Sequence, residues 1–134
     1  MSTRILAPLS VVVTDGVSLR EDFAYDAEAY DVIEVVLAAG ASAKEVSLQP
    51  GAATQVHLLG IKANIYTQAV PGTDDISFKV HDVGNPAIEL GTAILLTGVG
   101  AISVLGAVPD KLYFYNAGAL SKNITIVIAR DATP

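Results

Sequence analysis

The chain has 134 residues, of which 51% are hydrophobic and 16% charged, and its formal net charge is −6. This length predicts one domain that buries roughly two-thirds of its unfolded surface, and the composition excludes a disordered tail. Its eight scattered lysines and arginines argue against nucleic-acid binding, which needs clustered cations. Because there is no cysteine, disulfides and thiolate metal sites are excluded, while the redox compartment stays open.

The N-terminal region predicts a short arm, residues 1–9, that leads into a first strand holding Val11 and Val13. Residues 14–16, Thr-Asp-Gly, predict the turn that ends this strand, because glycine tolerates positive φ. The pattern over residues 18–30 is ambiguous, since a short amphipathic helix and an acidic loop both fit it. We favour a loop or an irregular strand there.

From Asp31 onward, apolar and polar residues alternate with a period of two, and turn residues follow at short intervals. This pattern is typical of an all-β sandwich or barrel. The inward parity changes between Leu58 and Leu59, where we expect a β-bulge or a bend. The inward-facing residues expected along these strands are Ile33, Val35, Leu37, Val46, Leu48, Val56, Leu58, Leu59, Ile61, Ala63, Ile65, Ile76, Phe78 and Val80.

An uncharged stretch runs from Leu90 to Pro109 and reaches the lower range of length for a membrane-spanning helix. Its four glycines lower helix propensity and it lacks flanking cations, so we expect no membrane contact. We expect instead two buried strands, residues 93–97 and 101–105, joined by a glycine-rich turn.

Residues 111–130 carry the clearest structural signal of the chain. Alternation on both sides of the turn at residues 116–118 predicts an antiparallel strand pair that closes the sandwich, followed by a tail, residues 131–134. The inward residues of this pair are Leu112, Phe114, Ile124, Ile126 and Ile128. The whole chain, residues 1–134, is therefore expected to form a single all-β domain, an antiparallel two-sheet sandwich of jelly-roll type.

The sequence assigns no catalytic, cofactor-binding or metal-binding residue. His57 and His81 would supply only two ligands, whereas a stable zinc site usually needs at least three protein ligands. The histidines have no G-x-S-x-G context, and no G-x-G-x-x-G sequence joins a strand to a helix. We therefore expect a chain that is not an enzyme and that binds no cofactor.

Tyr113 and Tyr115 point away from the expected inward face of their strand. Two tyrosines on one strand suit a protein interface or stacking on sugars, so we expect them to contact a partner. The weak charge of the chain also indicates that some sheet edges or faces are covered by another copy or by a partner.

The segments VSLQPGA, VHLLGIKANIY, LYFYNAG and NITIVIARDATP follow one another in this order. Together they resemble the small β-sandwich virion proteins of tailed bacteriophages, such as capsid cement or decoration proteins, over about residues 32–134. The resemblance implies a non-enzymatic protein of the virion, on the capsid surface or tail. Its partners would be other copies of itself, in a homo-oligomer, and a major capsid or other virion protein.

Other classes stay open at this point, because one fold serves many functions. A carbohydrate-binding module would use Tyr113 and Tyr115, and a tail or fibre adaptor would occupy another place on the same particle. A small hydrolase would use His57 or His81.

Overall fold

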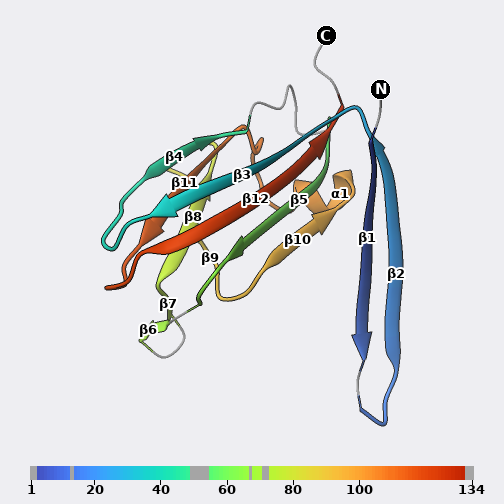
Figure 1. Cartoon of the computed structure of the whole chain (residues 1–134), viewed down its shortest axis with the longest axis horizontal. Coiled ribbons are helices and arrows are strands. Elements are labelled where there is room, and N and C mark those ends of the chain that lie inside the picture. Colours follow the sequence, from blue (N-terminus) through green and yellow to red (C-terminus); the bar gives the residue numbers. More distant parts are fainter. Residues whose placement is uncertain (1–2, 13, 49–54, 67, 71–72, 132–134) are drawn as a thin grey trace.

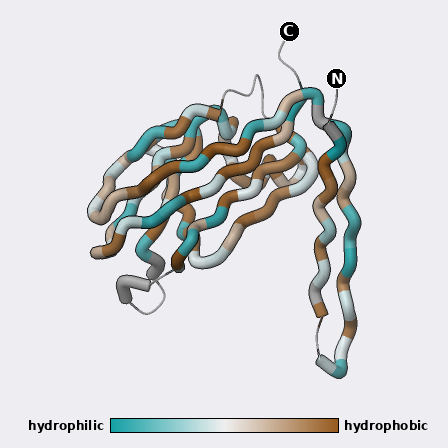
Figure 2. The backbone as a smooth tube through the Cα atoms, in the orientation of Figure 1, coloured by the Kyte–Doolittle hydropathy of each residue, from teal (hydrophilic) through white to brown (hydrophobic). Residues whose placement is uncertain are grey.

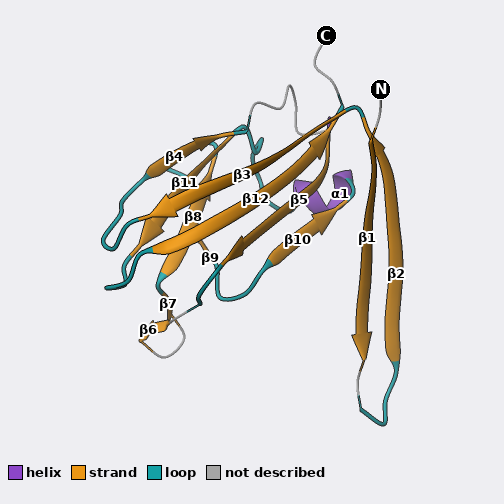
Figure 3. Cartoon of the chain, in the orientation of Figure 1, coloured by secondary structure: helices purple, strands orange, loops and turns teal. Residues whose placement is uncertain are grey.

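The computed structural model describes residues 3–12, 14–48, 55–66, 68–70 and 73–131. It confirms the expected all-β sandwich, with two four-stranded antiparallel sheets that pack against each other (Figure 1, Figure 3). A two-stranded hairpin extends away from one end of the sandwich. A second, much smaller ribbon consists of β6 (Gln68–Val70) and β7 (Thr73–Asp74).

The strand order is that of a jelly roll. Sheet one contains, in spatial order, β10 (Ile94–Thr97), β5 (Val56–Ala63), β12 (Lys122–Arg130) and β3 (Ala29–Leu37). Sheet two contains, in spatial order, β4 (Lys44–Ser47), β11 (Lys111–Asn116), β8 (Ile76–Val80) and β9 (Ile88–Glu89). When these eight strands are counted along the chain, the orders are 6-3-8-1 and 2-7-4-5. Among them only β8 and β9 are consecutive and in the same sheet, which is the nested arrangement of a jelly roll.

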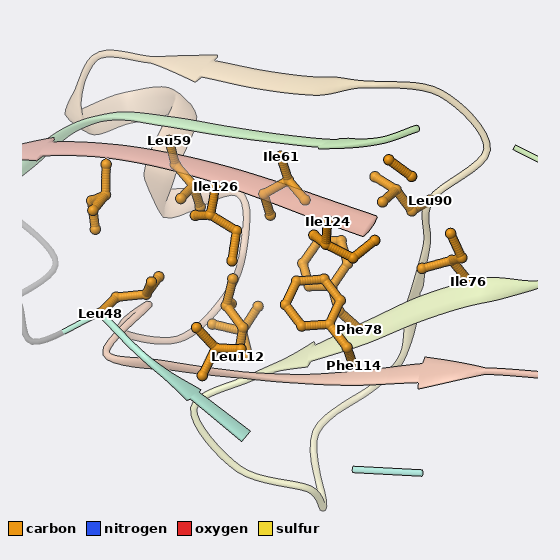
Figure 4. Close-up of a cluster of buried hydrophobic side chains, with 14 of the residues drawn as sticks. Leu48, Leu59, Ile61, Ile76, Phe78, Leu90, Leu112, Phe114, Ile124 and Ile126 are labelled. Carbon is orange, nitrogen blue, oxygen red and sulfur yellow. The ribbon is translucent and has the colours of Figure 1, made fainter. Parts of the chain in front are cut away.

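The core lies between the two sheets and consists of side chains that alternate inward along each strand (Figure 4). Phe78 and Phe114 lie at its centre, with ring centroids 5.7 Å apart. The five inward residues expected for the last two strands are fully buried, as predicted: Leu112, Phe114, Ile124, Ile126 and Ile128. Ile65, which we expected to point inward, is instead 42% exposed because β5 ends at Ala63.

The predicted pairing of the last two strands is wrong. β11 lies between β4 and β8 in sheet two, whereas β12 lies between β5 and β3 in sheet one. The two strands therefore face each other across the core and do not pair. A hairpin and a connection that crosses between sheets give the same alternation of apolar residues. The predicted inward faces of β11 and β12 are therefore correct, whereas their predicted pairing with each other is not.

The hairpin comprises β1 (Thr3–Val12) and β2 (Ser18–Ala27), which pair along their whole length. The turn expected at residues 14–16 is confirmed, with Asp15 at φ 59°. Residues 3–9, expected as an arm, instead belong to a strand, and residues 18–27 form a regular strand rather than a loop, an irregular strand or a helix. Continuous pairing between the two segments outweighs their weak local preferences. Val13, residues 1–2 and residues 132–134 lie outside the described part of the chain.

The uncharged stretch after Leu90 is only partly as expected. The first predicted strand is present as β10, but it is an edge strand that is only partly buried, with Leu95 41% exposed. The second is replaced by a short helix, α1 (Val99–Ser103). Gly98 has φ 89° and starts this turn of helix, and Ile102 is the helix residue buried in the core. Across the described residues, no helix is long and apolar enough to cross a membrane.

The irregularity expected in β5 lies slightly earlier than predicted. Ala129 pairs with Leu58 but Arg130 pairs with Val56, so the extra residue is His57. The extra residue lets Val56 as well as Leu59 face the core between the sheets, whereas Leu58 points to the outer face and is still only 4% exposed. The base of the hairpin covers Leu58.

Candidate functional site

The base of the hairpin is attached to the outer face of sheet one. Its apolar side chains Ile5, Ala7, Phe23 and Tyr25 pack against Leu58, Val127 and Ala129 of the sandwich. In a strand, side chains two residues apart share a face, so Ile5 and Ala7 of β1 lie opposite Tyr25 and Phe23 of β2 on one side of the ribbon. This small second core holds the hairpin at its base.

Three polar side chains reinforce this attachment. The Tyr25 hydroxyl donates a hydrogen bond to the Asp131 carboxylate at 2.6 Å, and the His57 ring nitrogen Nε2 lies 3.3 Å from the same carboxylate. The rings of Tyr25 and His57 stack, with centroids 4.2 Å apart. The contacts thus link β2, β5 and the residue that follows β12.

Ionisation of the two acidic groups in this cluster is shifted in opposite directions. Burial and the hydrogen bond to Asp131 raise the pKa of Tyr25. The hydrogen bonds from Tyr25 and His57 lower the pKa of Asp131 below its ordinary value of 3.8. The folded protein therefore favours the neutral phenol and the ionised carboxylate.

Replacing Asp131 by asparagine should loosen the hairpin base and release the pKa of Tyr25 toward its ordinary value. The stability that Asp131 contributes is present above pH about 4 and is lost as the pH falls through its lowered folded-state pKa, because a protonated carboxyl loses the interaction. The difference in urea midpoint between the wild type and Asp131→Asn should therefore be small at pH 7, since Asp131 is partly exposed, and should vanish in acid. Ultraviolet titration of tyrosinate should show one tyrosine ionising at lower pH in the variant. An unchanged titration would contradict the assigned hydrogen bond.

The hairpin also leaves apolar side chains in water, at Leu6 on the side of the base that faces away from the sandwich and at residues beyond the base. Leu6, Val17 and Leu19 are 68%, 82% and 70% exposed, and Val12 near the end of β1 is also exposed. Figure 2 shows hydrophobic segments along the hairpin, separated by hydrophilic and neutral ones. A strand of ten residues spans about 33 Å, so roughly half of the ribbon extends past the contacts at its base.

The outer face of sheet one continues from the hairpin base as rows of side chains that run across the strands. The row under the hairpin contains Tyr30, Ala129 and Leu58, the next contains Val32, Val127, Gly60 and Leu95, and the third contains Glu34, Thr125 and Lys62. A hollow of 210 Å³ lies beside Gly60, bordered by Leu95 and Val127 among others. A more polar hollow of 510 Å³ adjoins it across Lys62 and Thr125. The second row is thus an apolar groove that the described part of the chain leaves open around Gly60, although Val127 also packs against the base of the hairpin.

Tyr113 and Tyr115 lie together on the outer face of sheet two, as their parity predicts, and both are half-buried. The Tyr113 hydroxyl donates a hydrogen bond of 3.4 Å to Glu45, and the Lys79 ammonium lies 5.2 Å from the centre of the Tyr115 ring. Burial and the charge of Glu45 raise the pKa of Tyr113. A cation over Tyr115 covers one ring face, which suits a protein contact better than a stacked sugar. Contact with a partner stays a prediction.

The two histidines are not brought together. His57 belongs to the hairpin attachment on sheet one, whereas His81 follows β8 of sheet two, has φ 73°, and places Nδ1 2.8 Å from Asp110. Among the residues that the structure describes, no three His, Cys, Asp or Glu side chains gather closely enough to hold a metal ion.

Sequence reasoning missed the hairpin surface, although a signal for it was present. Phe23 and Tyr25 alternate with Asp22, Ala24 and Asp26, which is a period of two. The charged residues around them, such as Asp22 and Asp26, led to the prediction of a loop.

Fold and surface together define a jelly-roll protein with a projecting, partly apolar β-hairpin. Comparison with protein-family models, with curated proteins and with solved structures found no match.

Proposed function

We propose that the chain is a non-enzymatic structural protein of a phage virion, a capsid cement or decoration protein that assembles in several copies. The observation that supports this most directly is the hairpin, which exposes Leu6, Val17 and Leu19 beyond a well-packed sandwich. Removing such side chains from water is favourable, and exposed apolar patches mark interaction sites. A protein whose task is assembly has a reason to carry them.

The rest of the surface is consistent with the same role. With only 16% charged residues, the chain can bury neutral surface against its neighbours at little desolvation cost. Jelly rolls occur in viral capsid proteins, but they also occur in lectins, so the fold alone supports the proposal only weakly. The expected partners are other copies of the chain and a major capsid or other virion protein.

The deciding experiment measures whether the chain is present in purified virions, and at what ratio to the major shell protein. A ratio near one supports a cement or decoration role. A few copies per particle would instead support the tail or fibre adaptor. Absence from particles that retain their other structural proteins would contradict both roles.

Tyr113→Ala should weaken binding to the particle about tenfold, because truncating an interface tyrosine commonly has an effect of this size. The fold should persist, since Tyr113 lies outside the core. Binding of the purified variant to particles that lack the protein provides the measurement. Ser77→Ala is the matched control, because Ser77 lies opposite Tyr115 in the neighbouring strand and carries a small side chain. Equal binding by Tyr113→Ala and the wild type would remove Tyr113 from the interface, and glycan binding lost only in Tyr113→Ala would favour the carbohydrate-binding module.

A further inference from the structure

We infer that the outer half of the hairpin of one copy docks on the apolar groove of sheet one in a second copy. The groove is the row Val32, Val127, Gly60 and Leu95. This inference rests on the proposed assembly role and specifies which surfaces of the chain meet.

The proposed docking continues a contact that the chain already makes between its hairpin and sheet one. Ile5, Ala7, Phe23 and Tyr25 of the hairpin base pack on the row of sheet one that contains Leu58 and Ala129. On the same side of the ribbon, Leu9 and Leu19 continue this apolar face past the sandwich, and Leu19 is 70% exposed. The groove is the very next row of the same sheet, where Val32 and Leu95 are 58% and 41% exposed. The apolar face of the hairpin therefore continues past its contact, and the groove row, whose Val127 already packs against the hairpin base, stays uncovered at Val32 and Leu95.

The groove also has room for a side chain from another copy. Gly60 gives its row a gap with no side chain, and the hollow of 210 Å³ beside it is almost entirely apolar. A Cβ built at Gly60 would meet the Leu95 Cδ1 atom at 3.6 Å, which is an ordinary contact. The strand could therefore carry a side chain there, so the gap is not required by the fold. A leucine from outside fits a hollow of this kind.

The two surfaces also carry opposite charges. Glu21 is the charged residue on the apolar side of the hairpin, where it lies opposite Leu9. Lys62 is the cation on the outer face of sheet one among the described residues, and it borders the hollow. Docking that places Leu19 beside Gly60 can place Glu21, two residues further along the same face, beside Lys62. Opposite charges at matching positions fix the register of an interface.

A charge-reversal cycle tests the docking, with sedimentation equilibrium or light scattering as the measurement of self-association. Glu21→Lys and Lys62→Glu should each weaken association about tenfold or more, because like charges then meet at the interface. The double variant should recover most of the loss. Asp22→Lys is the matched control, because Asp22 is adjacent in sequence and points to the opposite side of the hairpin, so association should be nearly unchanged.

Gly60→Val provides a second test that does not depend on charge. The valine should fill the hollow, leave the unfolding midpoint close to that of the wild type and weaken association.

A third test uses the absence of cysteine in the chain. Leu19→Cys protein mixed with Leu95→Cys protein should form a disulfide-linked dimer under oxidation, whereas Ser18→Cys, on the opposite side of the hairpin, should not.

The outcomes separate this inference from the proposed function. A wild-type chain that is monomeric at micromolar concentration overturns the docking, as does association that none of these variants changes. If the chain is nevertheless present in virions, the virion role stands without this interface. If the charge cycle behaves as expected but virions lack the chain, the interface stands and the virion role falls.

Discussion

Replacing Phe114 by alanine is expected to lower the free energy of unfolding by about 3–5 kcal/mol. Phe114 is fully buried between the sheets and packs on Phe78, so its truncation removes apolar burial and leaves a cavity at the centre of the core. The two rings belong to neighbouring strands of sheet two, paired in register, and both face sheet one. The cavity would therefore weaken the contact between the sheets rather than the pairing within one sheet.

Urea unfolding measured by circular dichroism provides the value for Phe114→Ala, provided that the slope with denaturant is unchanged. Tyr113→Ala is the internal control, because Tyr113 is the adjacent residue and points to the other side of the same strand. Its loss should be much smaller. Similar losses for the two variants would mean that the inward parity of β11 is not what we describe.

The sequence predicted the parity of strands much better than their partners. Leu112, Phe114 and Ile126 were expected to point inward and are fully buried, because alternation is a local property of a pleated strand. Pairing is not local. In a jelly roll the strands that follow one another mostly cross between sheets, so β11 and β12 do not pair although their sequence resembles a hairpin.

Leu58 and Ile102 show two other limits of sequence reasoning. Leu58 was assigned to the core from its hydrophobicity, and it is buried, but by the hairpin rather than by sheet two. Its neighbour Leu59 faces the main core by ordinary alternation, and the bulge at His57 lets Val56 face the same core. Ile102 was placed on a strand because short apolar runs do not distinguish a buried strand from a turn of helix.

The hairpin surface could be predicted least, because it depends on contacts distant in sequence. Tyr25, His57 and Asp131 come together only once β2, β5 and the end of β12 are in place. No local pattern links these residues. The groove beside Gly60 likewise appears only when four strands are set in register.

Asn116 is a buried polar side chain at the point where the chain leaves β11 for β12. It is 1% exposed, and its Nδ2 atom donates hydrogen bonds to the carbonyl oxygens of Leu37, Ala38 and Leu120 at 3.2, 3.2 and 2.8 Å. Its Oδ1 atom accepts a hydrogen bond of 3.0 Å from the Gly118 amide. One amide thus joins the end of β3 in sheet one to the end of β11 in sheet two.

Asn116→Ala should therefore lower the free energy of unfolding by about 3 kcal/mol, because it removes all four hydrogen bonds of a buried side chain. Leu37 and Ala38 keep a second donor for their carbonyl oxygens, the Ser121 hydroxyl and the Ala41 amide. Asn116→Asp is the sharper variant. It keeps the shape and the acceptor for Gly118 but replaces the donating Nδ2 by an oxygen that faces carbonyl oxygens. It should be at least as destabilised at pH 7 and should recover part of the loss in acid, because the protonated carboxyl can donate one hydrogen bond.

The control for both variants is Asn123→Ala, an exposed asparagine near the start of β12. Urea midpoints at pH 7 and in acid should separate the three proteins, with Asn123→Ala close to the wild type at both values. If Asn116→Asp matched the wild type at pH 7, the donated bonds would contribute little. The crossing between sheets would then be held by the apolar residues on either side of it, Phe114 and Ile124, rather than by the amide.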